Sequence, residues 1–364
     1  MSRELPGIVS AYRFDQRGVA RRLADDEVAD ALDRLQADGD DWCWIHLNLA
    51  DQRAKHWIER ASSLVAEARD VLLIDDPHPR LELVDDTLIG VLTDLHHESV
   101  PEDEQHLSHE ELSFGRLFFA MTPRLLVSGR RHPLHSVEQV RRHLSLNQLK
   151  PDEPIDLVEK MVVRFARLTE LVLGRMAEAL DDIEDQVLDD DPHDERRRLA
   201  PMRRTAVAMR RQLAPMKTMF EKFAQEEIDD SRADVDEEDD AAVDARERRI
   251  DFETSLRAAA ARLAQRLDGL AHDIEAIQER ARLLSDQIAM DMAEQTNRHL
   301  YLLSIMSALL LPPTLIAGVF GMNTSSLPWT DGDGGSWWAI GLAAATSVAA
   351  FIALVRIGVA RRRS

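Results

Sequence analysis

The sequence has little cysteine and lacks the residue patterns that carry covalent chemistry. Its one cysteine, Cys43, forms no internal disulfide and no cysteine-based zinc site, and its apolar neighbours favour a buried strand. We find no nucleophile triad, glycine-rich phosphate loop or Walker motif, so we expect neither an enzyme nor an ATP-driven pump, and no permanently bound cofactor. The N-terminal segment has no uninterrupted apolar stretch, because Arg3, Glu4 and Arg13 break it. We therefore expect the N-terminal part to remain in the cytoplasm.

Basic residues are too few to balance the acidic ones. The chain has 45 Lys and Arg against 66 Asp and Glu, which gives a formal net charge of −21. Nucleic acids bind to basic surfaces, so we expect no nucleic-acid partner. An acidic surface attracts cations. Solubility alone is the alternative explanation for the excess of acidic residues.

Charge is missing altogether from two runs near the C-terminus, Leu300–Thr330 and Gly334–Val355. Each run contains the roughly 20 apolar residues that a membrane helix requires. We predict transmembrane helices at about 300–320 and 337–357, joined by an external loop, 321–336; a buried hairpin of a soluble protein is the alternative.

The loop has no Lys or Arg, whereas Arg298 and the arginines at 356 and 361–363 lie on the other side. The positive-inside rule then places both termini in the cytoplasm, in a multi-pass protein of the cytoplasmic (inner) membrane.

The N-terminal region, residues 1–150, has the pattern of a cytoplasmic α/β domain. Apolar or alternating runs predict strands, and periodic segments between them predict helices near Asp25–Gln36 and Ser136–Leu146. The alternation of the two suggests an α/β sandwich layer with hairpin-like neighbours. The predicted strands are Ile8–Phe14, Trp42–Leu49, Leu81–Val84, Thr87–Leu95, Leu112–Met121 and Leu125–Ser128.

Proline is absent from Met216 to Leu311, and Gly269 is the one glycine of that stretch. Residues 151–299 accordingly predict long helices that form a stalk: Asp152–Asp189, Asp194–Glu227 and a third from Asp240 onward. In the third helix, apolar residues recur every three or four positions from Phe252 to Ile288, which predicts a packing stripe. If it continues to Phe320, its about 80 residues measure on the order of 120 Å. Two membrane helices cannot enclose a conduction path, so transport would require a symmetric ring of subunits.

The triplet Gly321-Met322-Asn323 follows the first predicted membrane helix. Small divalent cations hold their water tightly, and conduction requires binding weak enough for release. A ring of neutral amide oxygens, one from each Asn323, meets both conditions, and Gly321 lets the backbone turn at the helix end. A simple Gly–Asn helix cap is the alternative.

This arrangement resembles the CorA family of metal-ion transporters. Residues 297–323, NRHLYLLSIMSALLLPPTLIAGVFGMN, match the pore helix of that family over its whole length, and Pro79–Glu82 followed by Asp85 and Asp86 resembles an element of its cytoplasmic domain. The resemblance implies a homopentameric funnel: an α+β membrane protein with a cytoplasmic α/β domain (1–150), a long helical stalk (151–299) and a two-helix transmembrane domain (300–364). The triplet would then be the selectivity filter.

One face of the first membrane helix carries residues spaced three or four apart. Periodicity alone is equally consistent with helix packing, whereas in the family the matching face lines the pore. The resemblance implies an inner polar ring at Asn297, a hydrophobic constriction that gates by dewetting at Leu300 and Leu303, and a path lined further out by Leu311 and Thr314. The full face comprises Asn297, Leu300, Leu303, Ser307, Leu311, Thr314 and Gly318.

The loop after the triplet, Thr324-Ser325-Ser326-Leu327-Pro328-Trp329, differs from the magnesium branch and is more similar to the zinc-transporting ZntB branch. We therefore expect divalent cations as the partners of the pore, with Zn²⁺ favoured and Mg²⁺, Co²⁺ or Ni²⁺ as the alternative. Coupling to H⁺ stays open. A membrane-anchored coiled-coil signalling or scaffold protein is the alternative of another class.

Other acidic and histidine-rich segments are weaker candidates for contact with metal. Asp331 and Asp333 either attract cations to the external loop or merely lie at the bilayer surface. A cytoplasmic acidic run comprises Asp236, Glu237, Glu238, Asp239 and Asp240, and a similar patch comprises Asp181, Asp182, Glu184, Asp185 and Asp189–Asp191; solvated charge explains both equally well. His96, His97, Glu98, His106 and His109 have the chemistry of zinc ligands but no spacing of a closed structural site.

Overall fold

The computed structural model describes residues 7–24, 27–28, 32, 41–61, 63–74, 76–101, 112–188, 192–226, 240–321 and 335–361. The chain divides into two compact units, Met1–Leu284 and Ser285–Ser364.

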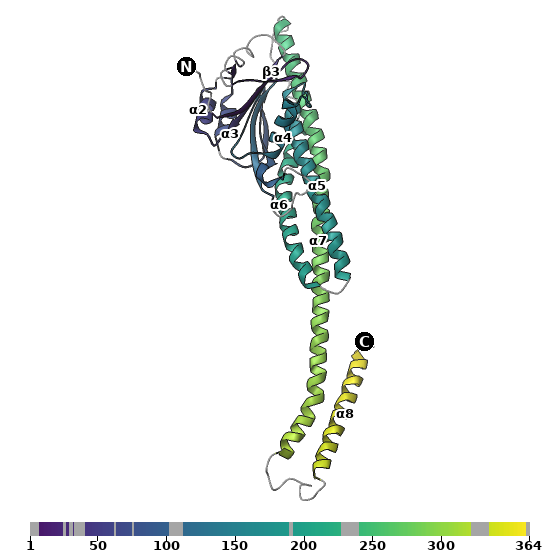
Figure 1. Ribbon diagram of the computed structural model, residues 1–364. Helices are drawn as coiled ribbons and strands as arrows, with labels where there is room; N and C mark the ends of the chain where they lie inside the picture. Colours follow the sequence, from purple (N-terminus) through teal and green to yellow (C-terminus); the bar gives the residue numbers. More distant parts are fainter. Residues whose placement is uncertain are drawn as a thin grey trace. The chain divides into compact units, whose positions relative to one another are not determined.

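The first unit is built on a seven-stranded sheet with the order β2-β1-β3-β7-β6-β5-β4 (Figure 1). Neighbouring strands are antiparallel except β3 and β7, which are parallel. The hairpins expected in the second half of the domain are present as β4–β5 and β6–β7. The strands are β1 (Ile8–Phe14), β2 (Ala20–Arg22), β3 (Trp42–Asn48), β4 (Arg80–Val84), β5 (Thr87–Leu95), β6 (Phe114–Thr122) and β7 (Leu125–Arg130).

Helices cover both faces of this sheet, because side chains of a strand alternate between its two faces. In β3, Cys43, Ile45 and Leu47 join a buried apolar cluster together with residues of α2 (Gln52–Arg60) and α3 (Ala66–Leu73). The other face meets α4 (His135–Ser145), α5 (Pro154–Leu188) and α6 (Pro192–Gln225). Figure 1 shows α2 and α3 on one side of the sheet and α4 to α6 on the other.

A buried polar group ties β3 to β7 on the second face. The Nε1–H of Trp44 donates to Oγ of Ser128 over 2.8 Å, and Nδ1 of His46 lies 2.8 Å from the same oxygen. All three side chains are buried. Burial lowers the pKa of His46 well below its ordinary value, and the positive charges of Arg130 and Arg141 lower it further. His46 is therefore a neutral hydrogen-bonding group at cellular pH.

Helices α5, α6 and α7 (Asp240–Gly321) lie side by side in the first unit. Every residue of the predicted apolar stripe of α7, from Phe252 to Ile288, is buried. The long helices thus begin and end close to the predicted positions, because packing along an apolar stripe supplies most of the stability of such helices. Pro201 and Pro215 lie inside α6 without ending it.

Ion pairs fix the register of α7 against its two neighbours. Ascending positions of α7 pair with ascending positions of α5, as in Arg262–Glu159 at 2.6 Å and Arg280–Glu184 at 2.5 Å. The pairs with α6 run in the opposite order: Lys217–Asp268 at 2.5 Å and Arg210–Glu275 at 2.9 Å. Helix α7 is therefore parallel to α5 and antiparallel to α6. Exposed pairs contribute little free energy each, so their main effect is to favour one alignment.

Among the described residues of the first unit, β2, α2, α3 and the short 3-10 helix η1 (His97–Ser99) were not predicted. Strand β2 is too short for a periodic pattern, and charged residues hide the apolar side of α2, where Ala54 and Ile58 are the buried residues. The helix predicted over Asp25–Gln36 lies largely outside the described residues; Glu27, Val28 and Leu32 are helical.

The second unit holds the C-terminal part of α7 and helix α8 (Gly335–Arg361). Helix α7 continues through Pro312 and Pro313 without a break. Within the described residues it contains a segment long and apolar enough to cross a membrane, and none of that segment is buried. In α8 the apolar segment is shorter, Ile340–Ala353. Length and composition thus support the first predicted membrane helix, and the second only in part.

We predict that Ser128→Ala lowers the free energy of unfolding by about 1–3 kcal/mol, because it leaves the buried donor of Trp44 without an acceptor. Unfolding of the detergent-solubilised protein, followed by tryptophan fluorescence, measures the change. Ser10→Ala is the matched control, since Oγ of Ser10 is equally buried but has no hydrogen-bond partner within the described part of the chain. Equal losses in the two variants would contradict this prediction.

Candidate functional site

The residues predicted to line a pore share one exposed face of α7. Asn297, Ser307, Thr314 and Gly318 are exposed, as are the predicted gate leucines, of which Leu303 has 61% of its surface exposed. At 100° per residue, these positions fall within about a third of the helix circumference. The single chain therefore leaves this whole face uncovered.

The opposite face of the same segment is the one that is partly covered. Its half-buried residues are centred about 180° away from the predicted pore face. They are Ile305, Ala308, Leu309, Pro312, Pro313, Ile316 and Phe320. The segment therefore has two different sides: one shielded within the second unit, and one left for another chain, for lipid or for a water-filled space.

Helix α8 has a matching half-buried stripe of small residues: Ala343, Thr346, Ser347 and Ala350. Small residues allow close approach of helices in lipid. Oγ1 of Thr346 and Oγ of Ser347 donate to the carbonyl of Ala343 over 3.0 and 2.9 Å. The hydroxyls are satisfied within their own helix, which is how such groups are tolerated in an apolar environment.

On the exposed face of α7, Thr314 bonds within its own helix, and the glycines meet no packing contact among the described residues. Oγ1 of Thr314 donates to the carbonyl of Leu310 over 2.6 Å, which leaves its oxygen free to accept a hydrogen bond from water. A Cβ built at Gly318 or Gly321 meets no atom within 4 Å. Close packing inside the described chain therefore does not explain either glycine.

Several predicted site residues lie outside the described residues. Gly321 is the last residue of α7, whereas Met322 and Asn323 of the triplet follow it and are not described. The same holds for Asp331 and Asp333 of the loop and for the acidic residues 236–239. Asp240 begins α7, but its side chain is not described.

The acidic patch at the end of α5 is partly neutralised within the chain. Arg280 of α7 forms ion pairs with both Asp181 and Glu184. Asp182 and Asp185 belong to the same helix, while Asp189–Asp191 lie outside the described residues. Part of this patch therefore serves to dock α7 on α5.

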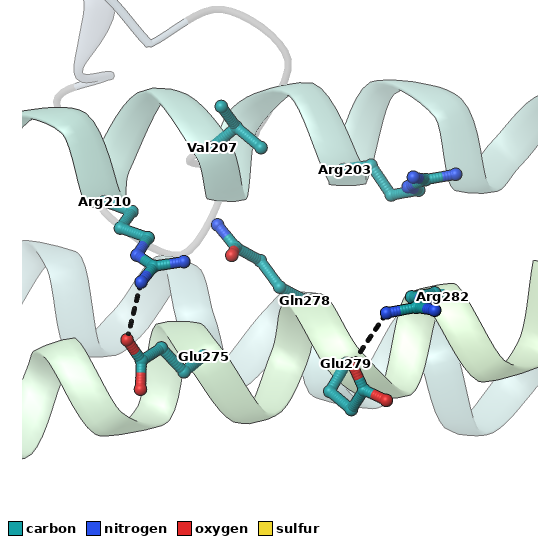
Figure 2. A pocket seen from close by; sticks show the side chains of 7 residues that line it. All are labelled: Arg203, Val207, Arg210, Glu275, Gln278, Glu279 and Arg282. Atoms are coloured by element: carbon teal, nitrogen blue, oxygen red, sulfur yellow. Dashed lines mark ion pairs between the residues drawn. The ribbon is translucent and has the colours of Figure 1, made fainter.

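A groove of about 520 Å³ separates α6 and α7 beside this bundle. Figure 2 shows arginines and glutamates from both helices along it, with dashed ion pairs for Arg210–Glu275 and for Arg282–Glu279 at 3.9 Å. Because charges of both signs line it, the groove has no strong preference for an ion of one sign. None of the predicted site residues lies in it.

Histidines are gathered at the end of β5. Among the described residues, no group of three or more His, Cys, Asp or Glu side chains is placed to close around a metal. His96, His97 and Glu98 lie at and beside the short 3-10 helix η1 (His97–Ser99), while His106 and His109 are outside the described residues.

The fold adds two histidines that the sequence analysis missed, His132 and His135. Their rings lie 5.3 Å from His96 and 5.6 Å from His97, centroid to centroid. They are distant in sequence, so only the pairing of β5 with the segment after β7 brings them together. Burial lowers the pKa of His96, and the neighbouring His132 lowers it further.

Comparison with known proteins agrees with this architecture. The model of the family described as CorA-like Mg²⁺ transporter protein matches residues 39–357. The zinc transport protein ZntB of Klebsiella pneumoniae is 28% identical over 338 residues, which cover 92% of this chain and 89% of that protein.

Two solved structures have the same fold along their whole length. Full-length CmaX aligns with a TM-score of 0.73 and 22% identity, covering 98% of this chain and 99% of that one. The CorA magnesium transporter of Methanocaldococcus jannaschii aligns with a TM-score of 0.68 and 15% identity, covering 96% and 97%. Because the family model spans most of the chain, this protein belongs to the CorA-like family of divalent-cation transporters, a family of membrane proteins without enzymatic activity.

Proposed function

We propose that this protein transports Zn²⁺ across the cytoplasmic membrane through a pore that several copies of α7 surround. The observation that carries the proposal is the exposed face of α7, which bears Asn297, Ser307 and Thr314 opposite the half-buried face. A helix that only anchors a protein in the membrane does not require polar residues aligned on one face. Lipid is a poor environment for them, because polar groups in the bilayer are costly unless they meet water or other polar groups.

A homopentamer, the assembly that the resemblance implies, would turn these faces toward a common axis. One chain supplies two membrane helices, too few to enclose water, so the path must be shared between subunits. In such a ring Asn323 supplies one amide per subunit at the outer end. Neutral amides favour a hydrated divalent cation without holding it, which permits release.

A constriction at Leu300 and Leu303 would close the path without any charge. Both side chains are exposed and lie on the predicted pore face. A ring of leucines excludes water from a narrow pore, and an ion cannot leave its water to cross such a ring. The path would open when the helices move apart.

Zinc is favoured over magnesium by the curated relatives and by the loop after the triplet. The ZntB protein of Klebsiella pneumoniae is named for zinc transport and covers nearly the full length of the chain. The family description and the Methanocaldococcus jannaschii structure name magnesium, so Mg²⁺, Co²⁺ or Ni²⁺ is the alternative cargo. Purified protein in liposomes, with Zn²⁺ and Mg²⁺ uptake compared with and without a pH gradient, decides the metal and the coupling to H⁺. Mg²⁺ uptake with no Zn²⁺ uptake would overturn the choice of zinc.

For the filter, we predict that Asn323→Ala lowers metal flux in liposomes at least about tenfold, because the hydrated cation loses its ring of amide oxygens. The oligomer should elute unchanged in size-exclusion chromatography. Thr324→Ala is the control, one residue further along the loop and without an assigned role. Normal flux through Asn323→Ala would remove the triplet from the conduction path.

For the gate, we predict that Leu303→Asn produces a leaky pore, with a higher basal flux than the unmodified protein, because a polar ring lets water stay in the constriction. Basal uptake into liposomes without an imposed gradient of pH measures this. Leu302→Asn introduces the same side chain one residue earlier, outside the predicted pore face. The gate assignment fails if the two variants leak equally.

For the topology, we predict that a cysteine at Asp333 reacts with an impermeant maleimide from outside intact cells, whereas one at Ser364 reacts only after the cells are opened. The native thiol gives little background, because Cys43 is buried and burial raises its pKa to about 11. Labelling of Ser364→Cys in intact cells would contradict the placement of both termini in the cytoplasm.

A further inference from the structure

The histidines at the end of β5 form two pairs that backbone hydrogen bonds hold in place. The amide of His96 donates to the carbonyl of Ser113 over 2.9 Å, and that of His97 donates to the carbonyl of Pro133 over 2.8 Å. His96 also forms an isolated β-bridge with Leu134. The imidazoles are thus presented by paired backbone, not by a free loop.

The spacing within each pair suits a shared metal ion. Two imidazole nitrogens bound to one tetrahedral zinc, each about 2.0–2.1 Å from it, place their ring centroids about 5 Å apart. The centroids of His96 and His132 are 5.3 Å apart, with the ring planes at 52°.

The two histidine pairs differ in their exposure to solvent. His96 is half-buried and His132 is exposed, so a hydrated cation has access and water can complete its coordination. His135, by contrast, is 2% exposed, which closes the second pair to a hydrated ion on one side. The first pair is therefore the candidate.

The surroundings of His96 have the features of a ligand support. Its Nδ1 lies 3.2 Å from Oγ of Ser113, so this nitrogen can donate to the hydroxyl while Nε2 is left to bind a metal. The Cδ2–Nε2 edge of the ring lies over Gly115: a Cβ there would lie 2.6 Å from Cδ2 and 2.7 Å from Nε2 of His96, so glycine at this position keeps space open beside Nε2. Glu98, two residues along, acts on His96 with a negative charge that favours a nearby cation.

We propose that His96 and His132 form a surface binding site for a divalent cation that prefers imidazole, with Zn²⁺ as the probe and water in the remaining positions. Imidazole nitrogen suits Zn²⁺, Ni²⁺ and Cu²⁺, whereas Mg²⁺ prefers oxygen ligands. The site lies in the first unit, apart from the pore face of α7, and does not depend on which metal is transported.

Zinc binding by the full-length, detergent-solubilised protein tests the site. Calorimetric titration with Zn²⁺ alone should give one equivalent per chain fewer for His132→Gln than for the unmodified protein, or a roughly tenfold weaker Kd for that equivalent. His96→Gln should behave in the same way, and excess Mg²⁺ should leave this equivalent bound. His56→Gln is the matched control, an exposed histidine beside Glu59 on α2 that should retain full binding.

Unchanged zinc stoichiometry and affinity in His132→Gln, or displacement of this zinc by Mg²⁺, would overturn the proposal. Because His132 is exposed, its substitution should leave the unfolding midpoint unchanged, so lost binding cannot be attributed to lost folding. Zinc flux through liposomes is read separately. A failed site therefore leaves the proposed pore intact, and a failed pore leaves the site intact.

Discussion

An apolar helix without cover is unstable in water, and the C-terminal part of α7 is such a helix. Leu303, Leu311 and Leu315 each expose more than half of their surface. Burying apolar area is the dominant stabilising contribution in water, and here one chain does not bury it. In a membrane transporter of the CorA-like family, lipid would cover part of this surface, and in the proposed ring other copies of the chain would cover the rest. The helix therefore requires surroundings other than water.

One continuous helix satisfies two different environments by changing its pattern along its length. Up to Leu284, α7 has a buried apolar stripe flanked by ion pairs to α5 and α6, the pattern of a helix packed in water. Beyond Leu300 the charges end, and the polar residues of α7 are the hydroxyl-bearing Tyr301, Ser304, Ser307 and Thr314. Ion pairs stabilise little at a water-exposed surface, whereas charged side chains are costly in lipid. The absence of charge beyond Leu300 is therefore typical of a membrane segment, as the ion pairs before Leu284 are typical of a helix in water.

The first unit combines an apolar core with a few buried polar contacts that specify the pairing of its strands. Trp44, His46 and Ser128 join two parallel strands that are far apart in sequence. A separate antiparallel bridge, between His96 and Leu134 of the segment after β7, places His132 beside His96. Local features of the sheet thus decide which side chains meet at its edge.

The sequence by itself determined the elements whose signal is periodic or compositional. It located β1, β5 and the long helices, the apolar stripe of α7 and the charge-free run that begins at Leu300, because alternation, helical spacing and absence of charge are visible along the chain. Tertiary structure decided the sheet order, the short helices α2 and α3, the neutralisation of Asp181 and Glu184 by Arg280, and the meeting of His96 with His132. These features depend on contacts between residues that are distant in sequence. Such contacts produce no periodic pattern along the chain.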